Sequence, residues 1–301
     1  MSLPSLRLIL SSLESLAPLS LAASWDNVGL LIAHSLPSEA PSSSPYNVLL
    51  TNDLTLPVLE HSLTAFDGGP ANLIISYHPT PFQALKKFTL ASPASRVVLT
   101  CAAHNIAVFS PHTSWDAAAA GLNDWLVEGI AQPLGGAVRT HAVKRSAGAL
   151  DEGTGDGRIA VLAQPATLAQ VIESVKAHLK LATVQVSLPV ACAAAAAGGV
   201  AAVRVAAEDT PVTSIAVCAG SGGSVLGGLT SASVWVTGEL SHHEVLAASA
   251  AGVAVILTNH SNCERGFLPH VAGRLQQSLL SSGADFRFLV SPVDADPLTT
   301  I

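Results

Sequence analysis

Three histidines in this 301-residue chain each follow a short apolar run, and two of them have a carboxylate four positions later. The residues concerned are His78, His112 with Asp116, and His260 with Glu264. Imidazole and carboxylate groups are the ligands that borderline divalent ions take in proteins. The pattern therefore predicts a metal site, with a donor set large enough for more than one ion.

The elements that must position these side chains are the apolar runs themselves, residues 73–76, 106–109 and 253–257. Each is short enough to be a buried strand, and each is separated from the next by segments with helical spacing. Strands that alternate with helices indicate an α/β protein, in which ligands bind beyond the carboxyl ends of the strands. We therefore expect the histidines at strand ends.

Each residue also has a structural interpretation. His78 precedes Pro79 and could cap a turn, Asp116 could be the N-cap of a following helix, and Glu264 could interact with a helix dipole. Spacing of four places His112 and Asp116 on one face if that segment is helical. Taken singly, the structural interpretations of His112 and Asp116 are the stronger ones; taken together, the five residues favour a shared metal site.

A change in composition divides the chain. Residues 145–158 are rich in glycine and charge and predict an exposed loop, so we place one α/β domain at 1–136 and a second at 137–301. The first would supply His78 and Asp116, the second His260 and Glu264, and the C-terminal helix would pack back on the first domain. The two His-x-x-x-carboxylate elements lie 148 positions apart, which hints at related topologies.

Further elements are expected from composition and spacing. Residues 35–45 predict a loop, 116–130 one alanine-rich helix, 203–206 a strand and 264–280 the last long helix. The glycine-rich run from Gly220 to Ser224 predicts a tight strand-to-helix turn, with an anion-binding loop as the alternative.

Composition excludes several classes of protein. The formal net charge is −7 without a stripe of lysine and arginine, which disfavours direct nucleic-acid binding. The longest apolar run is shorter than the roughly 20 residues that span a membrane. The four cysteines form no CxxC pair and no elbow motif surrounds a serine, so a reduced compartment and no nucleophilic triad are expected. The cytoplasm fits this composition, with the nucleus and the mitochondrion left open.

Several blocks of sequence carry a resemblance to a known family. They are Ser24–Leu31 (SWDNVGLL), Ile74–Pro79 (IISYHP), Pro111–Asp116 (PHTSWD), Gly121–Trp125 (GLNDW), Ala219–Ser224 (AGSGGS), Thr237–His243 (TGELSHH) and Asn259–Gly266 (NHSNCERG). In these blocks and their order the chain resembles the Nif-three-like family, also catalogued as GTP cyclohydrolase I type 2. Tyr77 stands where many bacterial members carry a second histidine, as in the eukaryotic branch.

The resemblance implies a dinuclear metal centre in a cleft between two α/β domains of a homo-oligomer. The family's ligand positions fall on His78, Asp116, His260 and Glu264, and His112 matches a neighbouring position. A neutral phenol at Tyr77 is a poorer ligand than imidazole, so one or two ions of zinc, iron or manganese are expected per chain.

Two functions follow as expectations. The first is a metal-dependent hydrolase of a small-molecule substrate, a nucleotide according to the family's catalogue name, in which Glu264 holds metal and His112 moves a proton. The second is a non-catalytic regulatory module with a structural metal site. It would bind a protein partner, since the family name comes from an interaction with a transcriptional co-regulator.

Overall fold

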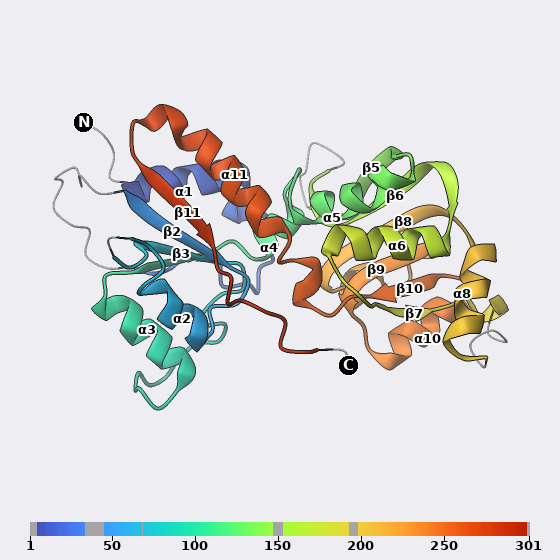
Figure 1. Cartoon of the computed structure of the whole chain (residues 1–301), viewed down its shortest axis with the longest axis horizontal. Coiled ribbons are helices and arrows are strands. Elements are labelled where there is room, and N and C mark those ends of the chain that lie inside the picture. The colour runs from blue at the N-terminus through green and yellow to red at the C-terminus, as the bar shows by residue number, and fades with distance from the viewer. Residues whose placement is uncertain (1–4, 34–44, 68, 147–152, 193–197, 300–301) are drawn as a thin grey trace. The chain divides into compact units, whose positions relative to one another are not determined.

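The structure, a computed structural model, describes residues 5–33, 45–67, 69–146, 153–192 and 198–299. The chain forms two compact units, each with its own sheet (Figure 1). The first unit combines Met1–Trp115 with Phe267–Ala295, and the second combines Asp116–Gly266 with Asp296–Ile301. Both are mixtures of helices and strands, so the expected α/β class is confirmed.

The sheet of the first unit has the strand order β1-β4-β3-β2-β11. Four neighbouring strands are parallel and only β1 is antiparallel. The strands are β1 (Gly29–Ile32), β2 (Tyr46–Thr51), β3 (Leu73–Ser76), β4 (Ala107–Ser110) and β11 (Phe286–Val290). All four residues of β3 and of β4 are buried, as expected for parallel strands covered on both faces.

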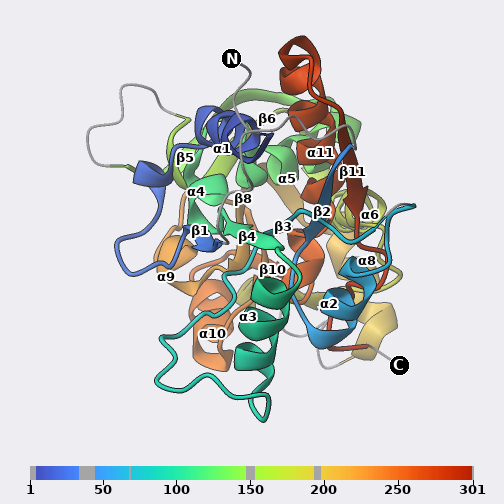
Figure 2. The ribbon, with the colours of Figure 1, turned by 90° about the vertical axis from the view of Figure 1, so that its left-hand side faces the viewer.

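Helices cover both faces of this sheet (Figures 1 and 2). On one face lie α1 (Ser5–Leu16) and α11 (Phe267–Leu279), and on the other α2 (Leu56–Ser62) and α3 (Pro93–Ala103). Short helices η1 (Leu19–Leu21) and η5 (Leu280–Ser282) complete the unit, and α4 (Thr113–Ala117) contains the boundary between Trp115 of the first unit and Asp116 of the second. Leu49, Ile74 and Val108 pair across β2, β3 and β4 and pack with α2 and α3 in one apolar core.

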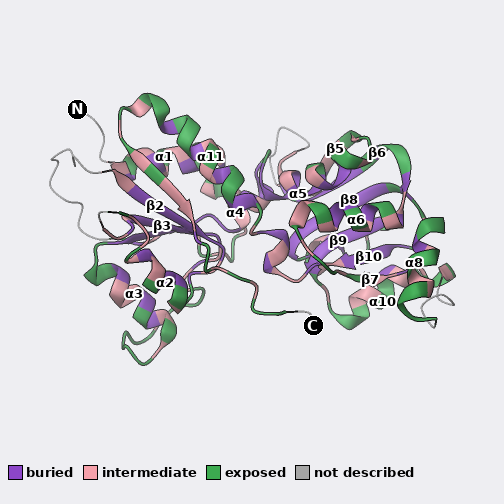
Figure 3. Ribbon diagram, viewed as in Figure 1, coloured by how far each residue is buried: buried purple, intermediate pink, exposed green. Residues whose placement is uncertain are grey.

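The sheet of the second unit has the order β5-β6-β8-β9-β10-β7, in which β8, β9 and β10 are parallel. Its strands are β5 (Ala137–Arg145), β6 (Gly155–Thr167), β7 (Gln185–Ser187), β8 (Pro211–Ser221), β9 (Val234–Glu239) and β10 (Ala254–Leu257). Its helices are α5 (Leu122–Ala131), η2 (Gln132–Leu134), α6 (Leu168–Leu179), η3 (Val190–Cys192), α8 (Gly199–Asp209), α9 (Gly223–Leu226), α10 (His242–Ala250) and η4 (Ser261–Cys263). The central strands are buried, while the outer faces of the helices are exposed (Figure 3).

A buried ion pair fastens α5 to β6. The guanidinium of Arg158, which is fully buried, donates to both carboxylate oxygens of Asp124 at 2.6 and 2.9 Å. Its remaining N–H groups donate to the carbonyls of Gly155, Gly157 and Ala118. Because this network joins α5 to the second sheet, residues from Asp116 onward belong to the second unit, whereas the sequence placed the boundary at 136.

Three expected elements differ from the structure. Residues 203–206 (VRVA) lie within helix α8, because the alanines that flank the two valines are strong helix formers. The alanine-rich helix is interrupted: α4 ends at Ala117 and α5 begins at Leu122. The last long helix begins at Phe267, after Glu264. The loop expected at 35–45 lies almost wholly outside the described residues.

In the described part of the chain, we find no helix that is both long enough and apolar enough to cross a membrane.

Candidate functional site

In the first unit, His78 follows β3 and is fixed from three sides. The backbone N–H groups of Tyr77 and His78 donate to the carbonyls of Thr51 and Asn52, which extends the pairing of β3 with β2. The Ser76 hydroxyl donates to the carbonyl of His78, and the imidazole Nδ1 lies 2.9 Å from Asp53 Oδ1. A carboxylate on Nδ1 is the usual support of a histidine that binds metal through Nε2.

His112 follows β4 and has the same kind of support. Its Nδ1 lies 2.7 Å from Asp26 Oδ1, and the other oxygen of Asp26 accepts from the backbone N–H and the hydroxyl of Thr113. The ring centroids of His112 and His78 are 5.2 Å apart. The first unit therefore brings two of the predicted histidines together, each paired with a carboxylate through Nδ1.

Tyr77 contributes to this ring cluster rather than to the surface. It is 2 % exposed, and its ring contacts those of His78, His112 and Trp115. The phenol ring packs against both imidazoles and against Trp115. A histidine at this position, with its smaller ring, would fill this space less completely.

Asp26 should stabilise the first unit in a pH-dependent way. Burial alone would raise the pKa of this carboxyl, but hydrogen bonds from His112 and Thr113 outweigh burial and hold the pKa below its ordinary value. The stabilisation is then complete above pH 3.8, the ordinary value, and is lost as the pH falls through the lowered pKa. We expect Asp26→Asn to lower the free energy of unfolding at pH 7 by about 1–3 kcal/mol.

Urea unfolding at pH 7 and at a series of acid pH values measures this effect. The difference between Asp26→Asn and the native chain should shrink in acid, where Asp26 itself becomes protonated. Asp67→Asn, at an exposed aspartate of the same unit, is the control and should leave stability unchanged. Equal effects of the two substitutions would show that the His112–Asp26 pair contributes nothing.

In the second unit, Asp116 lies in α4 and is tied to the end of β8. The Asn123 side chain donates to the carbonyl of Asp116 and accepts from the backbone N–H of Ala219. His112 is not on the same helical face as Asp116, because it precedes α4 and has a positive φ of 34°. His112 belongs to the first unit and Asp116 to the second. The two residues, although four positions apart in sequence, therefore do not form one structural element.

His260 and Glu264 flank the turn η4 that follows β10. His260 Nε2 lies 3.4 Å from Glu264 Oε1, and His260 Nδ1 lies 2.9 Å from Glu239 Oε1 at the end of β9. Glu264 is only 2 % exposed. It precedes α11, so it does not serve as a first-turn residue of that helix.

Two glycines allow the strand ends to approach this pair closely. A Cβ on Gly220 would lie 2.6 Å from Glu264 Oε1 and 3.0 Å from His260 Nε2, and Gly220 has a φ of +66°. A Cβ on Gly238 would lie 2.7 Å from the Cα of His260. The strand ends can lie this close to the histidine–glutamate pair because these two positions carry no side chain.

The buried thiols beside this pair are not nucleophiles. Burial first, and the charge of Glu264 second, raise the pKa of Cys263 to about 12. Burial also raises the pKa of Cys218, and the negative charges of Asp116, Asp156 and Glu264 raise it further. Asp116 and Glu264 therefore act on the same thiol of the second unit, and neither cysteine ionises near neutral pH.

The glycine-rich run is a turn and not an anion cradle. β8 continues through Ser221, and α9 after it has only four residues. A Cβ on Gly223 would lie 2.1 Å from Glu244 Oε1, so a carboxylate already occupies the space beside that turn. The strand-to-helix interpretation of Gly220–Ser224 is the one that fits.

The residues of the second unit fit a divalent cation. An imidazole whose other nitrogen is held by a carboxylate stands beside a buried glutamate, and Gly220 adds no side chain that would displace their donor atoms. Such a set of nitrogen and oxygen donors suits zinc, iron or manganese. The sequence places Glu239 after a strand and Asp26 within a block that carries the family resemblance, but it did not indicate that either residue supports a histidine, and Asp53 was not singled out.

Comparison with known proteins identifies relatives of this chain. A sequence model described as Duf34/NIF3 (NGG1p interacting factor 3) matches residues 4–297. "Protein NIF3 homolog" of Schizosaccharomyces pombe is 41 % identical over 289 residues, which cover 96 % of this chain and 95 % of that protein. "NGG1-interacting factor 3" of Saccharomyces cerevisiae is 35 % identical, with 92 % and 90 % covered.

Solved structures share the fold. A Bacillus cereus protein described as related to NIF3 superposes with a TM-score of 0.77 at 19 % identity, over 97 % of this chain and 98 % of that one. Because the family match extends over nearly the whole chain, from the loop of Asp26 to the turn of His260 and Glu264, the chain belongs to the Duf34/NIF3 family.

Proposed function

We propose that this protein binds one or two divalent ions and acts as a metal-dependent hydrolase. The proposed ligands within the second unit are His260, Glu264 and Asp116, and His78 stays the further ligand that the family resemblance implies. One observation carries the proposal: His260 stands 3.4 Å from the buried Glu264 with its other nitrogen held by Glu239. Burying a carboxylate beside an imidazole is costly unless a positive charge compensates it.

The ion and the surrounding side chains would have separate roles in this reaction. A divalent ion bound there would supply Lewis acidity for hydrolysis. Glu239 and Asp53 hold His260 and His78 at Nδ1 and so fix the orientation of both rings. His112, held at Nδ1 by Asp26, would accept or donate a proton at Nε2, with Asp26 fixing the orientation of the ring.

The substrate in this proposal is a small molecule, and a nucleotide is the class that the family's catalogue name suggests. We further propose that this protein forms a homo-oligomer in the cytoplasm and binds neither nucleic acid nor membranes directly. It leaves the choice among zinc, iron and manganese to the experiment, because histidine with carboxylate suits all three.

Glu264→Gln tests the site. The amide keeps the size of the side chain and removes its charge, so we expect metal affinity and any metal-dependent hydrolysis of GTP to fall by at least about 100-fold, the upper end of losses caused by residues one step further from a metal. Elemental analysis after gel filtration measures metal per chain, and product analysis measures turnover. Glu264→Ala should give the same loss.

Glu173→Gln is the matched control, because Glu173 is an exposed glutamate of the same unit in a surface pair with Lys176. It should keep full metal content. If Glu264→Gln retained native metal content and native hydrolysis, the proposed site would be wrong; if metal were lost and hydrolysis stayed, only the catalytic part would fail.

The second candidate function is a regulatory module that binds a protein partner. It is favoured by one observation, the name NGG1-interacting factor 3 of the yeast relative that is 35 % identical to this chain. In that case the metal would be structural, and Glu264→Gln would weaken partner binding only through a lowered melting temperature. Binding of a purified partner that is unchanged by metal removal, together with no detectable hydrolysis, would favour this candidate over the hydrolase.

A further inference from the structure

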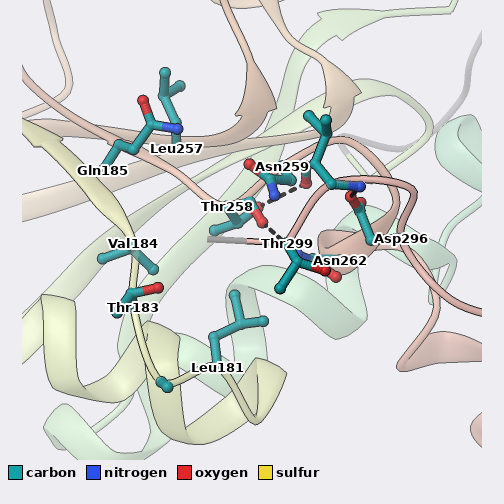
Figure 4. Close-up of a pocket in the computed structure, with 12 residues that line it drawn as sticks. Leu181, Thr183, Val184, Gln185, Leu257, Thr258, Asn259, Asn262, Asp296 and Thr299 are labelled. Carbon is teal, nitrogen blue, oxygen red and sulfur yellow. Dashed lines mark hydrogen bonds between the residues drawn. The ribbon is translucent and has the colours of Figure 1, made fainter. Parts of the chain in front are cut away.

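A pocket of about 310 Å³ opens in the second unit (Figure 4). Its lining includes Asn259 and Asn262 from the turn that carries His260, but not His260 or Glu264. One wall is the segment 181–185 that leads into the edge strand β7. The second wall is the turn 257–262 after β10, and the third is the C-terminal segment 296–299. Leu257 pairs with Gln185, so the pocket begins where the pairing of β10 with β7 ends.

Uncharged polar side chains surround this pocket. Within the described ranges of the chain, the side chains of Thr183, Gln185, Asn259 and Thr299 make no hydrogen bond to the protein. Asn262 uses its Nδ2 to donate to the carbonyl of Thr258 at 2.8 Å, which leaves its Oδ1 as an acceptor. Asn259 has a positive φ of 66°, a conformation that asparagine tolerates better than most residues.

The pocket has no group that would attract an anion. None of its lining residues is lysine, arginine or histidine. Its one carboxylate, Asp296, is already used: Oδ2 accepts from the Ser261 hydroxyl at 2.7 Å and Oδ1 from the backbone N–H of Leu298 at 2.8 Å. A phosphate or carboxylate would therefore enter without a compensating charge, which is unfavourable.

Apolar side chains complete the lining and add a surface for a flat ligand. Leu181, Val184, Leu257 and Leu298 line the pocket beside the amides and hydroxyls. Binding sites commonly combine an apolar lining with a few polar groups that fix orientation, and about 300 Å³ is at the lower end of their size range. Asparagine and glutamine amides match the donor and acceptor edges of amides and ring lactams.

We infer that this pocket binds an uncharged, amide- or lactam-bearing small molecule through the side chains of Gln185, Asn259 and Asn262. The inference does not depend on the metal or on hydrolysis. It concerns a second site of the same unit, and a ligand there would contact the turn that carries His260 and Glu264.

Pairs of probes that differ only in charge test the inference. Nicotinamide and nicotinate share a ring and differ by an amide against a carboxylate, and uracil and orotate form a second such pair. Saturation-transfer difference NMR on the full chain should show the neutral member of at least one pair binding with a Kd on the order of 1 mM, a plausible value for a ligand of this size. The charged member should bind at least tenfold more weakly.

Two variants test whether the probe binds in this pocket. Gln185→Leu and Thr299→Val should each weaken binding of the neutral probe by about threefold to tenfold, the effect of one lost hydrogen bond. Gln164→Leu, at an exposed glutamine of β6 outside the pocket, should leave binding unchanged. Circular dichroism checks that each variant folds, and either pocket variant suffices if the other does not.

Three results would overturn the inference. They are failure of both neutral probes to bind, equal binding of charged and neutral members, and affinity that neither pocket variant lowers. Binding of glycerol or glucose in preference to both neutral probes would also overturn it, because the pocket would then recognise hydroxyls rather than amides.

Discussion

Replacing Gly220 with alanine should abolish divalent-ion binding by His260 and Glu264. The new Cβ would lie 2.6 Å from Glu264 Oε1 and 3.0 Å from His260 Nε2, so both donor atoms must move. Its φ of +66° adds backbone strain, and we expect the free energy of unfolding to fall by about 1–3 kcal/mol. Isothermal titration calorimetry with Zn²⁺ and urea unfolding measure the two effects.

Gly228→Ala distinguishes the steric clash of a new Cβ with the donor atoms from the backbone strain of a positive φ. Gly228 has a φ of +80° in the same unit, but a Cβ at this position would meet no atom within 4 Å. This control should lose stability by a similar amount and keep its metal affinity. If Gly220→Ala bound Zn²⁺ as tightly as Gly228→Ala does, the space beside the histidine–glutamate pair would not be a metal site.

Replacing Arg158 with methionine should cause the largest loss of stability in the second unit. Arg158 is fully buried, and its removal leaves the Asp124 carboxylate without the guanidinium and takes one donor from each of the carbonyls of Gly155, Gly157 and Ala118. An unpaired buried charge costs about 3–5 kcal/mol. Urea unfolding followed by far-UV circular dichroism measures this loss of stability.

The double variant Arg158→Met with Asp124→Asn tests the explanation. Removing both charges should recover about 1 kcal/mol or more relative to Arg158→Met alone, because no isolated carboxylate remains. Arg204→Met, at an exposed arginine of α8, should change stability by no more than about 0.5 kcal/mol. A double variant as unstable as the single one would show that packing, and not charge, explains the loss.

The sequence was informative about the strands and the histidines that follow them. Apolar runs of four or five residues identify β3, β4 and β10 because parallel strands are buried on both faces, and the polar residue after each run then lies at the strand end. His78, His112 and His260 all occupy such positions. The α/β class follows from the same alternation of strands and helices.

The supporting carboxylates were harder to find because they are distant in sequence. Asp26 pairs with His112 across 86 positions, whereas Asp53 and Glu239 pair with His78 and His260 across 25 and 21. No periodicity links residues at such separations. Applying the strand-end rule to polar residues of every kind would have found Asp53 and Glu239, but not Asp26, which lies in a loop.

The position of the unit boundary was hidden for a similar reason. Composition changes near residue 145, but Arg158 reaches back to Asp124 and Ala118 and joins the preceding helix to the second sheet. A buried arginine cannot be told from an exposed one by residue type alone. The boundary therefore depends on a tertiary contact that the local sequence does not encode.

The strand β11 has a consequence for how the protein is made. It pairs in parallel with β2, although residues 286–290 are translated about 240 positions after residues 46–50. While the ribosome synthesises the intervening residues, β2 presents its hydrogen-bonding groups on one side to the solvent. The first unit can therefore be completed only after nearly the whole chain has been synthesised, and nascent chains that stop before residue 286 should depend on chaperones.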